Sequence, residues 1–252
     1  MIRVGVVGAA GKMGATVCDA IVAADGLELA AAVDLVGGGG SIHGLTIAAD
    51  LKALAVAKCD VVVDFTVAGA ARTTLPWLAL HGMHAVVGTT GFSDYDLATF
   101  RQAFTGSNCL IAANYAIGAV LMMKFAEQAA PYFETAEIIE FHHNAKADAP
   151  SGTAMVTAQR MAAASNEWAA DPTKDEVIPG ARGGVGPGGI RIHGVRMMGM
   201  TASQEVILGS AGQTLVIRHD SNDRVSFMPG VVLACRKVGN LSGLTMGIDS
   251  LL

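Results

Sequence analysis

Apolar and polar positions alternate along the first half of the chain in a pattern that predicts strands followed by helices. Short apolar runs predict strands over Ile2–Val7, Leu29–Val33, Asp60–Phe65, His84–Val87 and Cys109–Ala112. Apolar residues at helical spacing predict helices over Met13–Ala24, Leu51–Ala57, Ala70–Leu80 and Tyr95–Phe104, and glycines 37–40 predict a loop. Apolar strands that alternate with helices indicate a parallel sheet covered on both faces, so we expect an α/β fold here.

The pattern changes after residue 114. Helices are predicted over Ile117–Ala130 and Ser151–Ala164, strands over Glu137–His143, Ile190–Met197, Gln204–Leu208 and Thr214–His219, and a long loop over 165–189. Residues 209–212 predict a hairpin turn, and consecutive strands joined by tight turns indicate a mainly antiparallel sheet. A last helix from Pro229 to Lys237 is expected to return to the first domain. We therefore predict one domain of residues 1–113 and 222–252, and a second, α+β domain of residues 114–221.

Composition narrows the classes of protein that fit. The 17 basic and 22 acidic side chains give a net charge of −5, which argues against a nucleic-acid partner or an anionic membrane surface. Hydrophobic residues make up 52% and charged residues 15% of the chain, which excludes a disordered protein. The uncharged stretches 73–93 and 102–123 are interrupted by proline, histidine or asparagine, so no membrane-spanning helix is expected.

The cysteines indicate the compartment. They lie in or beside apolar segments without CxxC spacing, at Cys18, Cys59, Cys109 and Cys235. This usage is typical of buried, reduced thiols, and we expect a cytoplasmic protein.

A glycine pattern directly follows the first predicted strand. Its residues, in GxxGxxG spacing, are Gly8, Ala9, Ala10, Gly11, Lys12, Met13 and Gly14. Glycines permit a tight turn and let backbone N–H groups approach a pyrophosphate, which a helix N-terminus also attracts. Asp34 ends the second predicted strand, where a carboxylate can accept hydrogen bonds from a ribose diol. The pattern predicts a dinucleotide site, and a plain strand–helix turn with a surface aspartate is the alternative.

The expected cofactor is NADH, NADPH or both. Asp34 favours NADH because a carboxylate repels a 2′-phosphate, whereas Lys12 attracts that phosphate. Two further turns are predicted at the carboxyl ends of strands, where parallel sheets bind ligands. They are Gly88, Thr89 and Thr90, and Ala112, Ala113, Asn114 and Tyr115. Either turn alone is typical of a mere connection.

The stretch from His142 to Thr153, HHNAKADAPSGT, carries most of the candidate chemistry. Adjacent histidines at the end of a strand point to opposite faces, and a histidine can supply a proton near neutral pH. Lys146 adds a positive charge or a second donor. Ser151 or Thr153 can cap the following helix, whose N-terminus attracts a carboxylate. The stretch therefore predicts a pocket for an anionic substrate beside a proton donor.

Two other interpretations of this stretch stay open. Glu140 and His142 share a strand face, which is compatible with zinc, although the usual ligand spacing is not complete. A surface loop followed by a helix cap is the plainest interpretation. The interpretation as a proton donor expects no metal.

The chain resembles the dihydrodipicolinate reductase family in segments that span nearly its whole length. These are VGVVGAAGKMG (4–14), VVGTTGF (86–92), AANYAIGAVL (112–121), EIIEFHHNAKADAPSGTA (137–154) and the region of IRHDSNDRVSFMPGV (217–231). The HHxxKxDxPSGT segment is very specific, whereas GxxGxxG alone is not.

The resemblance implies a Rossmann-type parallel-sheet domain with an inserted α+β domain for substrate binding and oligomerisation, in a homotetramer. It implies NAD(P)H-dependent reduction of a cyclic dicarboxylate, 4-hydroxy-tetrahydrodipicolinate, in diaminopimelate and lysine biosynthesis. It also implies His142 as proton donor and Lys146 as its catalytic partner. The substrate carboxylates would be held by His143, Ser151, Gly152 and Thr153, and the cofactor by Gly8–Met13, Asp34, Gly88–Thr90 and Ala112–Tyr115.

One departure from the family pattern lies beside the lysine. Many members have a further histidine there, and this chain has Ala145. The departure changes the expected substrate contacts but keeps the acid and the lysine. The resemblance assigns no role to Arg218, His219 or Arg224.

Two other functions remain alternatives to this one. A different Rossmann reductase would act on an aldehyde or a sugar instead of a ring dicarboxylate. A dinucleotide-sensing regulator would not need His142 and Lys146, and would normally add a segment that binds DNA or protein, which is not apparent here.

Overall fold

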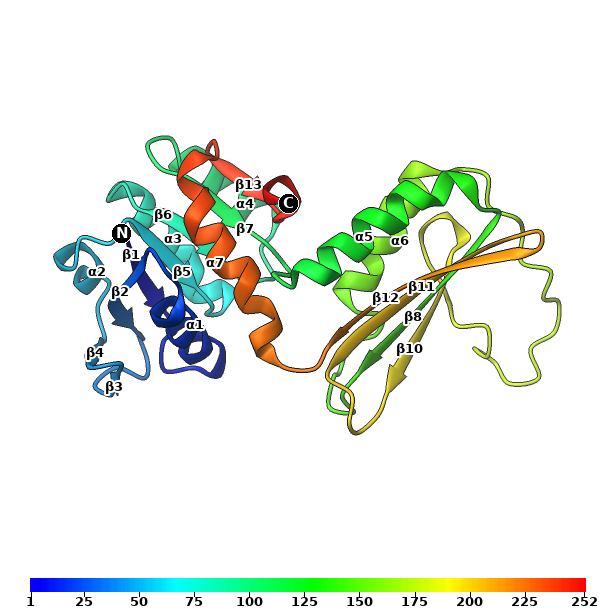
Figure 1. The fold of residues 1–252 in the computed structure, drawn as a ribbon, viewed down its shortest axis with the longest axis horizontal. Helices are drawn as coiled ribbons and strands as arrows, with labels where there is room; N and C mark the ends of the chain where they lie inside the picture. The colour runs from blue at the N-terminus through cyan, green and yellow to red at the C-terminus, as the bar shows by residue number, and fades with distance from the viewer. The chain divides into compact units, whose positions relative to one another are not determined.

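The computed structural model describes residues 1–252 and divides the chain into two compact units. The first unit contains Met1–Tyr115 and Arg224–Leu252, and the second contains Ala116–Asp223. The sequence predicts that the chain passes from one domain to the other after residues 113 and 221, whereas in the structure the unit boundaries follow residues 115 and 223. In Figure 1 the first unit carries both ends of the colour scale, and the second carries the green to orange part.

The first unit is built on an eight-stranded sheet with the order β13-β7-β6-β5-β1-β2-β4-β3. Its strands are β1 (Ile2–Val7), β2 (Leu27–Val33), β3 (Ser41–Ile42), β4 (Leu45–Ala48), β5 (Val61–Asp64), β6 (His84–Val87), β7 (Cys109–Ile111) and β13 (Leu244–Met246). All pairings are parallel except the β3–β4 hairpin. Strands β5 and β7 are buried along their whole length, as a parallel sheet between two helical layers requires. The expected Rossmann-type α/β architecture is confirmed.

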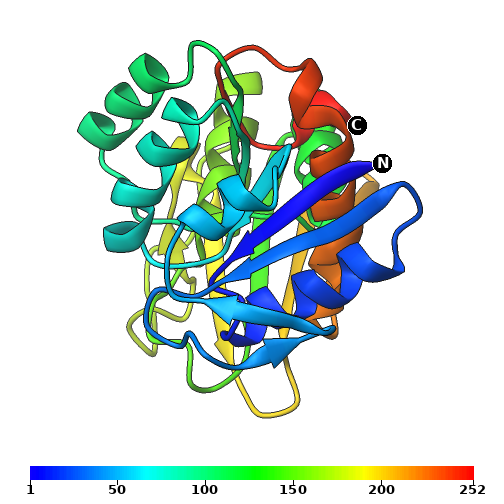
Figure 2. The same ribbon diagram turned by 90° about the vertical axis from the view of Figure 1, so that its left-hand side faces the viewer.

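Helices cover both faces of this sheet (Figure 2). One face is covered by α2 (Lys52–Val56), α3 (Ala68–Leu80) and α4 (Asp94–Ala103), the other by α1 (Lys12–Ala23) and α7 (Met228–Lys237). Beneath α2, α3 and α4 lies a core in which strand residues such as Val7 and Val62 join helix residues such as Leu75 and Phe100. Burial of a side chain of this size contributes about 1.5–3 kcal/mol, so this core holds the strands and helices together.

α4 begins with a capping box. Ser93 Oγ accepts a hydrogen bond from the N–H of Asp96 at 3.2 Å, and the Asp96 carboxylate accepts from the N–H of Ser93 at 2.8 Å. Arg72 of α3 donates to both Asp96 oxygens, at 2.8 and 3.0 Å. The Arg72 guanidinium and the Ser93 donors hold the pKa of Asp96 well below its ordinary value. These bonds tie α3 to the start of α4.

The second unit is a five-stranded sheet with the order β12-β11-β8-β10-β9. Its strands are β8 (Thr135–His142), β9 (Gly184–Val185), β10 (Arg191–Arg196), β11 (Ala202–Ser210) and β12 (Gln213–Ser221). The helices α5 (Ile117–Ala129) and α6 (Gly152–Ala164) pack side by side over one face (Figure 1). No helix of the chain covers the other face.

The mainly antiparallel pairing of this sheet is confirmed, but the strand order corrects one expectation. β10 does not pair with its chain neighbour β11; it pairs parallel with β8, which lies between them. The turn before β12 is also shorter than predicted, because Gly209 and Ser210 belong to β11 and only Ala211 and Gly212 connect the strands. A strand sequence carries little information about its partner, which tertiary packing selects.

The sequence pattern missed the shortest elements. The strands β3, β4, β9 and β13 have between two and four residues each, too few to show a period. One of them, β9, lies inside the stretch 165–189 that was predicted to be a loop. Short 3₁₀ helices occupy Ala130–Tyr132, Pro187–Gly189, Arg224–Phe227, Val238–Asn240 and Asp249–Leu251.

The cysteines behave as their surroundings predict. All four are buried and none forms a disulfide. Burial raises the pKa of the Cys18 thiol to about 12, which leaves it unreactive near neutral pH. The helices in the structure are all too short or too polar to cross a membrane.

Candidate active site

The glycine loop runs from the end of β1 into α1, as predicted. Gly8 has a φ of +86°, a conformation that side chains rarely adopt, and the N–H of Gly11 donates to the Gly8 carbonyl at 3.0 Å. A Cβ on Gly14 would overlap that same carbonyl oxygen. The turn itself therefore requires glycine at positions 8 and 14.

Asp34 directly follows β2 and reaches back to the glycine loop. Its Oδ2 accepts from the N–H of Ala10 at 3.2 Å, and its Oδ1 accepts from the N–H groups of Val36 and Gly37 at 3.1 and 2.7 Å. Burial raises the pKa of Asp34, but the three N–H donors outweigh it and hold the pKa below its ordinary value. An ionised carboxylate has about four acceptor positions, so Asp34 keeps about one for a ribose hydroxyl.

A cavity of about 250 Å³ lies against the glycine loop and Asp34. Its lining residues are Gly8, Gly11, Asp34, Leu35, Val36, Phe65, Thr66, Val67 and Ala70. The structure thus brings three predicted cofactor residues together at one cavity. No sequence pattern indicated the segment 65–67, which follows β5. Because β5 pairs in parallel with β1, the ends of both strands meet at one sheet edge, and this strand order is the signal that identifies the segment.

Asp64 joins the loops that follow β5 and β6. Its side chain is fully buried, and its Oδ1 accepts from the N–H and the hydroxyl of Thr66 and from the hydroxyl of Thr89, at 2.7–3.0 Å. The N–H of Thr66 also donates to Thr89 Oγ1 at 2.9 Å. Burial raises the pKa of Asp64 despite these donors. Thr89, a predicted cofactor residue, is therefore a buried brace between two loops.

The other predicted cofactor residues do not line the cavity. Exposed at the surface are Ala10, Lys12, Thr90 and Ala113, half-buried are Met13, Gly88 and Asn114, and buried are Ala9, Ala112 and Tyr115. Tyr115 turns into the core, where its hydroxyl donates to the carbonyl of Val87 at 3.0 Å. Gly88 backs onto the ring of Phe65, which a Cβ at this position would overlap.

In the second unit, His142 ends β8 and contacts Glu140 on the same strand face. His142 Nδ1 and Glu140 Oε2 form a hydrogen bond, and the Glu140 side chain is fully buried. Arg196 of β10 donates to both Glu140 oxygens, at 2.7 and 2.9 Å. The N–H of Ser151 donates to Glu140 Oε1 at 3.3 Å. One buried carboxylate thus connects the histidine, an arginine and the start of α6.

The charges around His142 act in opposite directions. Burial lowers the pKa of His142 below its ordinary value, the hydrogen bond and charge of Glu140 raise it, and Lys146 and Arg196 lower it again. Burial raises the pKa of Glu140, but Arg196 and His142 outweigh burial and hold that pKa below its ordinary value. Glu140 is therefore an ionised carboxylate between two side chains that carry or can carry positive charge.

The loop after β8 places Lys146 in the same neighbourhood. Lys146 Nζ donates to Asp148 Oδ1 at 2.7 Å, and the carbonyl of Asp148 accepts from Arg196 at 2.7 Å. His143 is exposed, and its carbonyl accepts from the N–H of Lys146 at 3.1 Å. Ala145, where many family members have histidine, is exposed.

The start of α6 completes this region. Ser151 is buried and caps the helix, because its Oγ accepts from the N–H of Ala154 at 3.2 Å. Gly152 and Thr153 form the first turn, where the partial positive charge of a helix N-terminus attracts anions. The side chain of Ser151 therefore caps the helix, and Gly152 and Thr153 lie at the helix N-terminus.

The structure offers no set of zinc ligands around Glu140 and His142. Glu140 and His142 share a face, as that interpretation requires, but they bond to each other and a guanidinium engages both Glu140 oxygens. No group of three or more His, Cys, Asp and Glu side chains in residues 1–252 is placed to hold a metal ion.

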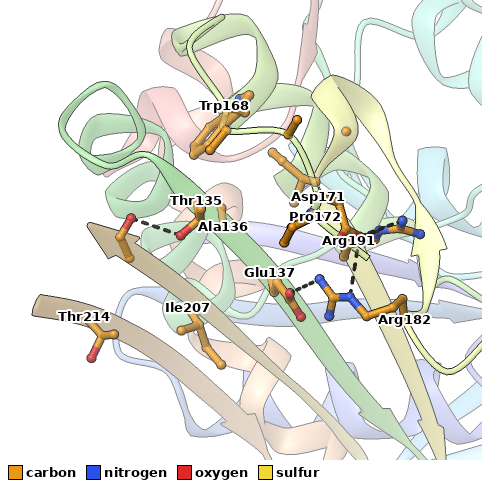
Figure 3. A pocket seen from close by; sticks show the side chains of 15 residues that line it. Thr135, Ala136, Glu137, Trp168, Asp171, Pro172, Arg182, Arg191, Ile207 and Thr214 are labelled. Atoms are coloured by element: carbon orange, nitrogen blue, oxygen red, sulfur yellow. Dashed lines mark hydrogen bonds and ion pairs between the residues drawn. The ribbon is translucent and has the colours of Figure 1, made fainter. Parts of the chain in front are cut away.

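A second cavity, of about 290 Å³, lies at the opposite end of β8 from His142 (Figure 3). Its charged side chains are paired with one another: Arg182 donates to Glu137 at 2.6 Å, and Arg191 donates to Asp171 at 2.8 Å. No residue from the predicted sites lines it.

Two of the three residues without an assigned role lie on β12, and the third lies in the first unit. Arg218 pairs with Glu205 and Asp220 at 3.0 Å and lies over the Phe141 ring, on the sheet face that no helix covers. His219 is on the other face of β12, against α5. Arg224 begins a 3₁₀ helix of the first unit.

Comparisons with known proteins cover the whole chain. Two family models match it: "Dihydrodipicolinate reductase, N-terminus" over residues 2–115 and "Dihydrodipicolinate reductase, C-terminus" over residues 118–252. Proteins named 4-hydroxy-tetrahydrodipicolinate reductase from Thermobifida fusca and Cutibacterium acnes are 52% and 47% identical to it. Each alignment covers 100% of this chain and 99% of the relative.

Solved structures agree with this similarity. Dipicolinate-bound dihydrodipicolinate reductase from Paenisporosarcina sp. TG-14 superimposes with a TM-score of 0.89 and 36% identity, covering 100% of both chains. The DAP dehydrogenase of C. glutamicum has a TM-score of 0.54 and 13% identity, covering 97% of this chain and 92% of its own. That second likeness shows a shared fold alone.

Proposed function

This chain belongs to the dihydrodipicolinate reductase family, and from that membership we propose that it reduces 4-hydroxy-tetrahydrodipicolinate to tetrahydrodipicolinate with NADH or NADPH. The reaction belongs to diaminopimelate and lysine biosynthesis. The observation that carries the proposal is the buried carboxylate of Glu140, which bonds to both His142 and Ser151. It joins a proton donor to a helix N-terminus that attracts carboxylates, and reduction of a cyclic dicarboxylate needs both.

The first unit fits a dinucleotide. We propose that the glycine loop, Gly8–Met13, holds the pyrophosphate through N–H groups and that Asp34 accepts from the adenosine ribose. The turns 88–90 and 112–115 would line the rest of the cofactor through their backbone, because the side chains of Thr89 and Tyr115 are buried in contacts of their own. Thr66 and Val67 join this set because they line the same cavity as Gly8 and Asp34. When bound, the nicotinamide supplies the hydride for the reduction.

The second unit holds the substrate in this proposal. The first turn of α6, Gly152 and Thr153, binds one ring carboxylate, and Lys146 and His143 bind and neutralise the anion. Ser151 contributes by capping that turn. Loss of water leaves an imine conjugated to a carbon–carbon double bond, and reduction at ring C4 spreads negative charge toward nitrogen. Protonated His142 then supplies the proton that completes the reaction.

Steady-state kinetics on enzymatically generated substrate, with each cofactor in turn, tests the proposal. We expect oxidation of NADH and NADPH that depends on the ring dicarboxylate and is absent with simple aldehydes. Turnover of aldehydes without turnover of the ring compound would identify a different Rossmann reductase. Cofactor binding without turnover of either compound would favour the regulator.

We also propose a homotetramer that forms through the sheet face left uncovered by α5 and α6. Strand register places Ile139, Phe141, Ile207 and Val216 on that face, and Val216 is 51% exposed. An exposed apolar patch of this kind is typical of an interface. Sedimentation equilibrium should give a tetramer, and Val216→Glu should lower the oligomeric state. A monomeric wild-type protein would contradict this proposal.

A cytoplasmic location is the last part of the proposal. All four cysteines are unpaired and buried, a state that reducing compartments maintain. Fractionation of the source cells with an antibody to the chain would test it.

A further inference from the structure

We infer that Glu140 is a positioning residue for the proton donor: it fixes the imidazole of His142 through Nδ1 and offsets the cations around it. The inference rests on the proposed function, in which His142 is the acid. The family resemblance assigns roles to His142 and Lys146, but none to the glutamate two residues earlier on the strand.

The hydrogen bond selects which ring nitrogen is available. Glu140 Oε2 engages His142 Nδ1, so Nε2 is the nitrogen left to exchange a proton with a ligand. An ionised carboxylate is an acceptor only, so it keeps a proton on Nδ1 and fixes the orientation of the ring. A carboxylate in this position also stabilises the imidazolium form.

Glu140 is itself held from the far side. Arg196 donates to both carboxylate oxygens, and these charge-assisted bonds would break if Glu140 rotated away from His142. Arg196 also donates to the carbonyl of Asp148, whose side chain pairs with Lys146. The arginine therefore braces both the glutamate and the loop that carries the lysine.

The surroundings leave Glu140 as the anion that bonds directly to His142. The groups facing this pair from neighbouring elements are Arg196 on β10, Lys146 and Asp148 on the loop, Ser151 at the start of α6, the uncharged Gln204 and Ala202 on β11, and His219 one strand further on β12. Two cations thus disfavour the imidazolium, and Asp148 is committed to one of them. Removal of the Glu140 charge would leave Arg196 without its carboxylate partner beside His142, while Lys146 stays paired with Asp148.

A purely structural role is the competing explanation. The Glu140–Arg196 pair links β8 to β10, and its loss would destabilise the unit whether or not His142 depends on it. The two explanations differ in what happens to the titration of His142.

The test compares Glu140→Gln with the wild type in the full-length protein. Selective ¹⁵N-histidine labelling reports the protonation and the tautomer of His142, with His142→Ala used to assign its signals. We expect Glu140→Gln to lower the pKa of His142 by about 1–3 units, the usual effect of a contacting opposite charge. The decline of kcat/KM at high pH should move to lower pH by the same amount, with activity partly recovered in acid.

Glu137→Gln is the matched control. Glu137 lies on the same strand, on the opposite face, and accepts from Arg182 at 2.6 Å (Figure 3). It also accepts from His193 at 2.8 Å. This control removes the same charge from an arginine–glutamate–histidine cluster that does not touch His142. The titration of His142 should stay at its wild-type position.

Arg196→Gln should shift the pKa of His142 in the opposite direction, and this test does not require Glu140→Gln to fold. It removes a cation that opposes the imidazolium, while His142 Nδ1 and the N–H of Ser151 still hold Glu140 in place, so the pKa of His142 should rise. An unchanged His142 titration in Glu140→Gln, even with a lower unfolding midpoint, overturns the inference, as does an unchanged or lower value in Arg196→Gln. The titration requires no turnover, so a wild-type protein without reductase activity would refute the proposed function separately.

Discussion

Lys146 Nζ lies 2.7 Å from Oδ1 of Asp148, two residues further along the same loop. The lysine side chain is 20% exposed and the aspartate side chain 66% exposed, so the cation is partly sheltered and its partner faces water. A substrate carboxylate that approaches Lys146 therefore competes with a carboxylate already in place.

The first prediction concerns that competition. Asp148→Asn should lower the KM for the ring dicarboxylate by about threefold, since an exposed ion pair is weak, and should leave kcat nearly unchanged. Steady-state kinetics measures both quantities, and Lys146→Ala, which should raise KM, is the control. A higher KM in Asp148→Asn would show that the aspartate shapes the loop instead of competing with substrate.

The second prediction concerns the proton donor. His142→Ala should reduce kcat by about 10²–10⁴, the range for loss of a general acid. The dissociation constant for NADH, measured by fluorescence titration, should stay at its wild-type value, because the predicted cofactor residues lie in the other unit. Near-full turnover in this variant would remove His142 from the mechanism.

The third prediction concerns pH. The acid must be protonated to act, and burial with Lys146 and Arg196 lowers the pKa of His142 in the free protein. The protonated fraction is therefore present below that lowered pKa and is lost as the pH rises through it. We expect kcat/KM to increase as the pH falls from 8 toward 6, with the decline in kcat lying at higher pH because a bound dicarboxylate favours the imidazolium. If kcat/KM instead increases as the pH rises from 6 to 8, this assignment is wrong.

The fourth prediction concerns cofactor choice. Asp34→Ala should lower the KM for NADPH and raise that for NADH, because the carboxylate repels a 2′-phosphate and accepts from a ribose diol. Lys12→Ala should weaken NADPH more than NADH. Each effect should be about fivefold, because both side chains are at a solvated surface. If the ratio of kcat/KM values for the two cofactors is the same in Asp34→Ala as in the wild type, Asp34 does not contact the ribose.

The fifth prediction separates two glycines of the same loop. Gly14→Ala places a Cβ onto the Gly8 carbonyl and should lower the free energy of unfolding by about 3 kcal/mol. In Gly11→Ala the new Cβ lies 3.3 Å from that oxygen, so the loss should be about 1 kcal/mol. Gly11→Ala should instead weaken NADH binding at least tenfold, because a side chain there blocks the close approach of a pyrophosphate. Urea unfolding and NADH titration of both variants distinguish the two effects.

The fold could be predicted where burial leaves a long signal. Asp60–Phe65 is predicted because consecutive valines are typical of a strand covered on both faces, and β5 (Val61–Asp64) is buried at every position. The strand order of the second sheet could not be predicted, because β10 and β11 have equally good patterns for pairing with each other or with β8. Backbone packing around β8 makes that choice.

The placement of some candidate site residues could also be predicted. Gly8, Gly11 and Asp34 lie close along the chain or at fixed strand ends, and the structure brings them to one cavity. Arg196 was missed because it is 56 residues from Glu140, and their contact depends on β10 pairing with β8. Tyr115 was placed correctly in the turn after a strand, but no sequence signal indicated that its ring turns inward.

The last strand, β13, has a consequence for how the protein is made. It pairs with β7, and the N–H of Gly243 donates to Asn108 across 135 residues of chain. Because the whole second unit is translated between β7 and β13, β7 is an open sheet edge on the ribosome until β13 emerges. A chain released early would carry that edge bare, and unpaired strand edges recruit strands from other chains. Pairing with β13 thus closes an edge of the first sheet that would otherwise be open to strands from other chains.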